Sequence, residues 1–199
     1  MRLAALVFAA CCGLVCALSH IGHPRSATRK QAIQAGCAAA CLPLFVQQPS
    51  IALEPKLTKL PDEEVVKRVT EDVVDRQFLA TADFTRALFD ESATFTDEID
   101  TYTLPKFIEG TKKLFDPDRS KVELTSPVVV DKDSVSFRFS EYLCFKLPVV
   151  QPIVSLSGKV VLTRDADSGL FTAYREYWDQ SPSQVVQSAR LTPPSVLLP

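Results

Sequence analysis

The feature that most constrains the fold is a strict alternation of side chains in the second half of the chain. Over residues 135–145 the odd positions carry Val, Phe, Phe, Glu, Leu and Phe, whereas the even positions are mostly polar. A period of two places alternate side chains on opposite faces of a β-strand. The same period recurs over 121–130, 154–162 and 170–179. Four such segments predict an antiparallel sheet with one face packed on a core.

Segments of helical period precede these strands. Valines recur at helical spacing between residues 62 and 79, after Pro61 and three acids that are typical of a helix start. A second amphipathic pattern over 104–115 ends at Asp116-Pro117. Shorter elements are expected as helices over 84–89 and 184–191 and as a strand over 93–96. Helices followed by a run of half-buried strands predict an α+β domain.

The first 53 residues differ in composition from the rest. They contain no Asp or Glu, both histidines and five of the six cysteines. The apolar run after Arg2 ends at residue 18, so it is short for a membrane span and typical of a signal peptide. Residues 23–30 are basic and hydroxylated, as in a transit peptide, and a second apolar run over 32–46 leads to Ser50-Ile51-Ala52.

We therefore expect a targeting presequence over 1–52, a linker over 53–60, a domain over 61–191 and a C-terminal tail over 192–199. The tandem arrangement resembles the presequences of secondary-plastid algae, with a signal peptide, a transit peptide and a thylakoid-transfer signal. This resemblance implies a plastid protein of the thylakoid lumen. A single signal peptide and secretion is the alternative, and a mitochondrial address or a retained anchor also stays open.

The composition of the remaining chain excludes several classes of function. All 24 acids but only 18 of the 22 bases lie beyond residue 53, and the absence of a basic stripe argues against nucleic-acid binding. Without residues 1–52 the chain has no histidine and one cysteine, Cys144, which excludes catalytic triads, Cys–His pairs and zinc sites. Cys144 falls on the polar side of its strand, so we expect a half-exposed, inert thiol. We expect no metal ion and no cofactor.

The domain resembles the NTF2-like superfamily, which includes the SnoaL-like proteins. The resemblance covers roughly Pro61 to Leu191 and is carried by the valine-striped first helix and by the segments Phe95–Glu98, Leu104–Phe107 and Tyr174–Asp179. It is nearest to uncharacterised NTF2-like proteins of plant and algal plastids. It implies a cone, in which a curved antiparallel sheet packs on N-terminal helices around a pocket. Because this fold hosts enzymes, carriers and interaction modules, it leaves the function open.

Two acids are candidate catalytic residues. Glu141 lies on the apolar face of its strand, where a carboxylate is costly unless it is paired or protonated. It is either a pocket acid with a raised pKa or a structural acid that pairs with Arg164 or Arg175, or reaches water at the strand end. SnoaL-like enzymes often draw an acid–base Asp from the pocket lining, which makes Asp97 the second candidate. A solvated acidic turn around Asp97 is its alternative.

The closing strand supplies further candidates for the pocket. Its odd positions include Arg175 and Tyr177 and its even positions include Glu176 and Trp178, and parity does not decide which set faces inward. If the odd set does, Arg175 pairs with Glu141. Core packing is the expected role of Trp178, with ligand stacking as the alternative. The candidate ligand pocket comprises Glu141, Arg175, Tyr177, Phe137, Phe139, Trp178 and Tyr102.

These observations lead to two hypotheses for the function. The first is a non-catalytic, thylakoid-associated NTF2-like module that binds a small apolar ligand or docks on a thylakoid protein complex. The alternative is a SnoaL-like isomerase, cyclase or dehydratase that uses Glu141 or Asp97 as a general base, with Arg175 or Tyr177 as the electrostatic partner. A homodimer through the exposed sheet face is compatible with either hypothesis.

Overall fold

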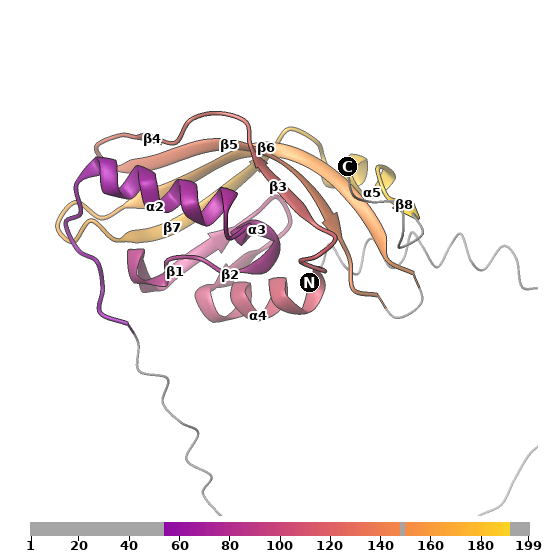
Figure 1. Ribbon diagram of the computed structural model, residues 1–199, viewed down its shortest axis with the longest axis horizontal. Coiled ribbons are helices and arrows are strands. Elements are labelled where there is room, and N and C mark those ends of the chain that lie inside the picture. Colours follow the sequence, from indigo (N-terminus) through magenta and orange to yellow (C-terminus); the bar gives the residue numbers. More distant parts are fainter. Residues whose placement is uncertain (1–53, 148–149, 192–199) are drawn as a thin grey trace, which may run out of the picture.

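A curved sheet arches over a layer of helices in the computed structural model, which describes residues 54–147 and 150–191 (Figure 1). The expected presequence and C-terminal tail lie outside these residues. The described part is an α+β domain, and a curved, unclosed sheet packed on helices is the architecture expected of an NTF2-like cone. No helix within the described residues is long and apolar enough to cross a membrane.

The valine stripe forms helix α2 (Asp62–Val74), which begins after Pro61 and carries three acids in its first turn. The single helix expected over 62–79 is divided, because Gln77 adopts a left-handed backbone (φ 57°) and a second helix, α3 (Phe78–Thr81), follows. The Gln77 side chain stabilises this break. Its amide accepts a hydrogen bond from the Val122 N–H and donates to the Val122 carbonyl, as a neighbouring strand would.

Of the three remaining helices, one has the expected length and the other two are shorter than expected. The helix expected over 84–89 is a single 3-10 turn, η2 (Arg86–Leu88). Helix α4 (Leu104–Leu114) matches its amphipathic pattern. Helix α5 (Pro182–Gln187) starts at a capping box between Ser181 and Gln184, and it ends earlier than expected because strand β8 follows.

The sheet has eight strands, whose bounds are β1 (Phe89–Thr96), β2 (Thr101–Thr103), β3 (Lys121–Leu124), β4 (Val129–Val130), β5 (Ser134–Cys144), β6 (Pro152–Arg164), β7 (Phe171–Trp178) and β8 (Arg190–Leu191). The main order is β2-β1-β7-β6-β5-β3, with β4 on β5 and β8 on β6. All pairs are antiparallel except β1 with β7, which run parallel. The sequence did not indicate this parallel pair.

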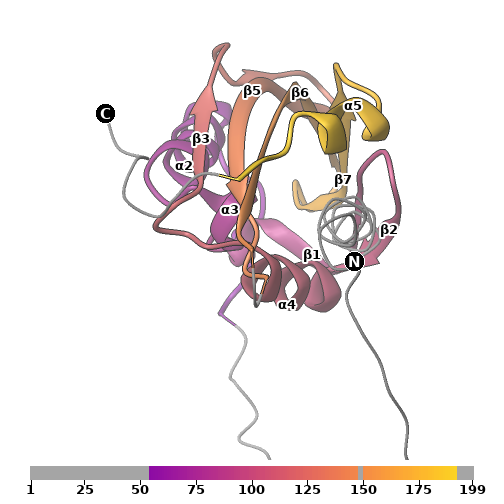
Figure 2. The same ribbon diagram turned by 90° about the vertical axis from the view of Figure 1, so that its right-hand side faces the viewer.

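The sheet stays open as it curves. In Figure 2, β3 stands on one side of the domain and β7, β1 and β2 on the other, with β5 and β6 arching between them and α4 below. Helices α2 and α4 therefore lie under the concave face, where α2 contacts β3 and β4, and α4 contacts β1 and β2. This face points into the core and carries the buried side chains of the long strands.

Gly158 allows the strands to approach closely where the sheet bends. It lies on the inner face of β6, opposite Phe139 of β5 and Trp178 of β7. A Cβ atom at this position would overlap the carbonyl oxygen of Tyr177 and lie 3.2 Å from the Phe139 ring. Glycine is therefore required here, and it leaves the inner wall without a side chain between β5 and β7.

The segment before the first helix is fastened to the domain, although the sequence suggested a linker over 53–60. Leu57 N–H donates to the Ala87 carbonyl, and Lys59 N–H donates to the Ser168 carbonyl. The Lys56 ammonium donates to the Phe89 carbonyl and pairs with a carboxylate of β1. These contacts make residues 56–59 part of the folded unit.

Candidate functional site

The structure decides which face of β7 points inward. The even positions Tyr174 and Glu176 are buried, whereas Tyr177 is 49% exposed. Arg175 lies on the same side as Tyr177, with its guanidinium 4.8 Å from the centre of the Tyr177 ring. It donates to the Asp97 carbonyl and pairs with Glu98 at 3.0 Å. Arg175 and Tyr177 therefore lie on the outer face, away from Glu141.

Glu141 lies on the inner face of β5 and is only 3% exposed. Its Oε2 atom is buried and has no hydrogen-bond partner among the described residues. Arg164, a partner considered for it, pairs instead with Asp62 at 2.7 Å. Burial, aided by the negative charge of Glu176, raises the pKa of Glu141 well above its ordinary value. Glu141 is therefore buried without the ion pair to Arg164 or Arg175 that the sequence left open, and its place in a ligand pocket stays a prediction.

Glu176 faces the same interior from β7, between two hydrogen-bond donors of its own strand. The Tyr174 hydroxyl donates to Oε2 and the Trp178 indole N–H to Oε1, each at 2.5 Å. These bonds favour the ionised form, but burial outweighs them and raises the pKa of Glu176 from 4.5 to about 7. Glu176 therefore changes its charge near neutral pH, where a general acid or base is most effective.

The two acids are on neighbouring parts of one wall. Glu176 is opposite Val160 of β6, and Glu141 is opposite Leu156 of the same strand. Gly158 is the inner-face residue between these two positions, so no side chain of β6 separates them there. The ionisation of one acid affects that of the other, because ionised Glu176 raises the pKa of Glu141.

Asp97 stands at the end of β1, beside this wall. Its carboxylate accepts hydrogen bonds from the N–H groups of Ile99 and Asp100, at 2.7 and 2.8 Å, and so holds the turn into β2. Burial raises the pKa of Asp97, and its charge in turn raises the pKa of Glu176. Asp97 is thus a turn residue that also adds negative potential to the interior.

The other candidate pocket residues have different positions. Phe137 and Phe139 are buried on the inner face of β5. Trp178 and Tyr102 are partly buried and pack against the core. The stacked rings of Phe107, Phe95 and Tyr174 continue this aromatic wall toward α4, with centroids 4.1 Å apart in the first pair and 5.1 Å in the second.

The charged residues that are buried as a whole in the described part of the chain are all acids, namely Asp72, Glu141 and Glu176. Arg68 and Arg119 are not buried as whole residues, although Nε of both and one terminal nitrogen of Arg119 are buried without a hydrogen-bond partner. Within the same residues no group of His, Cys, Asp and Glu is arranged to hold a metal ion. Cys144 is fully buried, which corrects the expectation of a half-exposed thiol, and burial raises its pKa.

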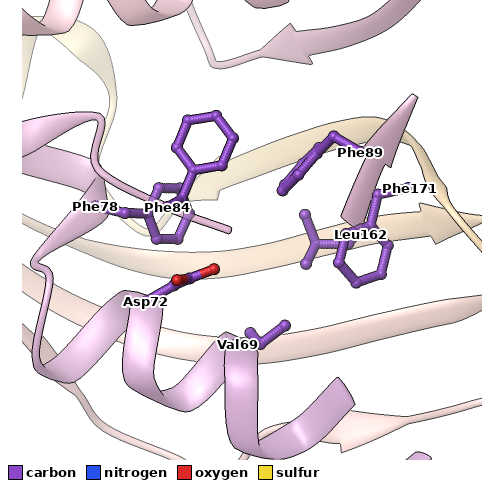
Figure 3. Close-up of a pocket in the computed structure, with 7 residues that line it drawn as sticks. All are labelled: Val69, Asp72, Phe78, Phe84, Phe89, Leu162 and Phe171. Atoms are coloured by element: carbon purple, nitrogen blue, oxygen red, sulfur yellow. The ribbon is translucent and has the colours of Figure 1, made fainter. Parts of the chain in front are cut away.

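Sequence reasoning missed Asp72, which borders a small apolar pocket between α2 and the sheet. The pocket is lined by Val69, Asp72, Phe78, Phe84, Phe89, Leu162 and Phe171 (Figure 3). Its free volume of about 10 Å³ has room for one water molecule. The signal for Asp72 was its place seven residues after Val65, on the buried stripe of α2.

Comparisons with known proteins identify similar structures but no family. No family model and no curated protein matches the chain. Among solved structures, a protein described as a SnoaL-like polyketide cyclase from Jannaschia sp. CCS1 has 16% identity and a TM-score of 0.48, covering 69% of this chain and 99% of that one. An NTF2-like superfamily protein from Salmonella enterica has 12% identity and a TM-score of 0.43, covering 61% and 95%.

An LEH-like epoxide hydrolase from M. tuberculosis has 14% identity and a TM-score of 0.44, covering 64% of this chain and 94% of that one. No activity, ligand or residue role is carried over from any of these proteins, because the identities are too low. The function has to be argued from the site itself.

Proposed function

We propose that the concave face of this domain binds a small, largely apolar molecule, which presents a polar group to Glu141 and Glu176. The observation that carries this proposal is the buried Oε2 atom of Glu141, which has no partner among the described residues. A buried polar atom without a hydrogen bond costs about 1–3 kcal/mol, so native proteins rarely keep one without a reason. A ligand that bonds to this atom supplies the reason.

The surroundings of the two acids fit such a ligand. Phe137, Phe139 and Leu156 give the wall an apolar surface, and Glu141 and Glu176 are its convergent polar groups. Small-molecule sites usually combine an apolar lining with a few polar groups of perturbed pKa. A structural role explains Glu141 less well, because a leucine at this position would pack without the cost of burying a carboxyl group.

A neutral fluorescent dye tests the proposal. Nile red should bind the purified chain saturably, with enhanced emission and quenching of Trp178, which is the chain's only tryptophan. Leu156→Trp fills the inner face and should abolish binding, whereas Val161→Trp, on the outer face of the same strand, should leave it unchanged. Circular dichroism checks that both variants fold. Absence of saturable binding to the folded wild type contradicts the proposal.

The pKa of Glu176 supports a second candidate function, which is proton-transfer catalysis of the isomerase, cyclase or dehydratase type. A carboxyl group that titrates at about 7 in an apolar site is suited to remove a proton next to a carbonyl group. Exchange of the α-protons of cyclohexanone in D₂O, followed by NMR, tests this idea. The exchange should exceed the buffer rate, rise through pH 7 and disappear in Glu176→Gln. Equal rates for the wild type and Glu176→Gln contradict it.

We also propose that the domain acts in the thylakoid lumen after removal of residues 1–52, where it docks on a thylakoid protein complex or forms a homodimer. The acid-free composition of the leader supports this address. Mass spectrometry of fractionated organelles should find an N-terminus near Leu53 in the lumen, and co-purification should find the complex. A mature chain that retains the leader, or is found outside the cell, contradicts the proposal.

A further inference from the structure

We infer that the polar group of the interior ligand is a protonated amine, held between Glu141 and Glu176. The inference rests on the proposed binding function and names the chemistry of the ligand. It is drawn from two buried acids on the inner face of the sheet, Glu141 of β5 and Glu176 of β7, in a part of the chain where no Lys or Arg is buried as a whole residue among those described.

The charges of Glu141 and Glu176 are not balanced by a base in the described part of the chain. Asp72, the third buried acid, is already satisfied by Thr85 and by Arg76, which lies 3.2 Å away. Among the described residues, no Lys or Arg forms an ion pair with Glu141 or Glu176. A ligand cation would remove the repulsion between the two acids, whereas a carboxylate ligand would add to it.

The charged neighbours of Glu141 and Glu176 also favour a cation. Asp97, in the turn after β1, makes the potential at Glu176 more negative. Arg175 of β7 moderates that potential, but its guanidinium is on the outer face and is committed to Glu98 and to the Asp97 carbonyl. The potential at the two acids therefore stays negative and attracts a cation.

The hydrogen-bond acceptors of the two acids match an ammonium group. An ammonium group has up to three donors and no acceptor, which matches acceptors that are short of donors. In the part of the chain that the structure describes, the Oε2 atom of Glu141 has no donor and each oxygen of Glu176 has one. Tyr174 and Trp178 turn their O–H and N–H edges, and not the ring faces that attract cations, toward this carboxylate, so the preference for an amine rests on the acceptors.

The competing ligand is a neutral molecule with a carbonyl or ether oxygen, which would accept a hydrogen bond from the un-ionised carboxyl group of Glu141. The two ligands respond to pH in opposite directions. An amine binds best to ionised acids, so its affinity should rise as the pH passes through 7. A neutral acceptor needs the protonated acid, so its affinity should fall over the same interval.

Three compounds of similar size distinguish these cases, with Trp178 fluorescence as the readout. At pH 8 the full chain should bind benzylamine at least about tenfold more tightly than benzyl alcohol. This ratio is what one charge-assisted hydrogen bond contributes to the affinity. Benzoate should bind more weakly than both. Between pH 6 and pH 8 the affinity for benzylamine should increase while that for benzyl alcohol does not.

Two variants test whether Glu141 causes the preference for benzylamine over benzyl alcohol. Glu141→Gln should remove the preference for benzylamine and keep the affinity for benzyl alcohol, because glutamine has the same shape without the charge. Glu109→Gln, which changes an exposed acid on α4, is the matched control and should bind like the wild type. If Glu141→Gln does not fold, the opposite pH trends of the wild type carry the same information.

The failure of this inference can be told apart from the failure of the proposed function. Equal affinities for benzylamine and benzyl alcohol, or no binding of benzylamine while Nile red binds, overturn the amine and leave interior binding intact. An absence of binding by all three compounds and by Nile red overturns both.

Discussion

Asp72 and Glu141 are buried to the same extent, with 3% of each residue exposed, but their surroundings differ completely. Asp72 accepts hydrogen bonds from the Thr85 N–H and hydroxyl at 2.9 Å each, and it pairs with Arg76. These contacts join α2 to the loop before β1. The Oε2 atom of Glu141 has no hydrogen-bond partner within residues 54–147 and 150–191, and its electrostatic neighbour is another acid, Glu176.

The contrast separates a structural acid from a functional candidate. Burial raises the pKa of both groups, so burial alone does not distinguish them. Their hydrogen-bond and ion-pair partners distinguish them. A carboxylate with such partners adds to the stability of the fold, whereas one without them lowers it. Loss of Asp72 should therefore weaken the domain and loss of Glu141 should strengthen it.

The largest expected effect is that of Asp72→Ala. The substitution leaves the Thr85 N–H without its acceptor and removes the ion pair with Arg76, so the free energy of unfolding should fall by about 2–4 kcal/mol. Urea unfolding followed by circular dichroism measures the change. Glu63→Ala, at an exposed position of the same helix, is the control and should have a much smaller effect. A midpoint like that of the wild type would mean that Asp72 is not structural.

The opposite change is expected at Glu141. At pH 8, Glu141→Leu should raise the free energy of unfolding by about 1–3 kcal/mol, because it removes an unpaired buried acid. Glu123→Leu, at an exposed position of the neighbouring strand β3, gives no such gain. Urea unfolding at pH 8 compares the two. Destabilisation by Glu141→Leu beyond that of the control would show that the protein itself satisfies Glu141.

The pH dependence of stability should carry the signature of Glu176. Its pKa is 4.5 in the unfolded chain and about 7 in the folded domain, so the folded state binds more protons between these values. This contribution to stability is complete below pH 4.5 and is lost as the pH rises through 7, with a total of a few kcal/mol. Urea midpoints at intervals from pH 4.5 to 8 should fall. The fall should be reduced in Glu176→Gln, and an identical profile in this variant contradicts the assignment.

The smallest of these effects tests the hydrogen bond from Tyr174. Its hydroxyl lowers the pKa of Glu176, so Tyr174→Phe should raise that pKa by about one unit. Fluorescence of Trp178, which donates to the same carboxylate, should report the shift as a later midpoint in a pH titration. Tyr142→Phe, on the exposed face of β5, is the control. An unchanged midpoint in Tyr174→Phe would show that the Tyr174 hydroxyl does not affect the pKa of Glu176.

Local pattern was sufficient to place Glu141 on the inner face. Its strand is long, and alternation over 135–145 leaves one parity for the core. The amphipathic stripe of α4 was likewise sufficient for its bounds. In both cases the period repeats often enough that neighbouring residues determine the element.

Tertiary contacts explain what the sequence did not show. Both parities of β7 carry aromatic residues, and the parallel pairing of β1 with β7 brings together residues far apart in the chain, such as Phe95 and Tyr174. The break between α2 and α3 depends on Gln77 reaching Val122 across the fold. A carboxylate inside a helical stripe, such as Asp72, was visible in the sequence but signals burial only when its partners are known.

Titration of the side-chain carboxyl carbons by ¹³C NMR tests the central claim most directly. In the ligand-free wild type, the resonances of Glu141 and Glu176 should titrate together well above the range of ordinary glutamates, in two steps that belong to the pair. Glu141→Gln should remove the upper step and leave that of Glu176 at about pH 7. Titration of both resonances near pH 4.5, like those of exposed glutamates, would contradict the account.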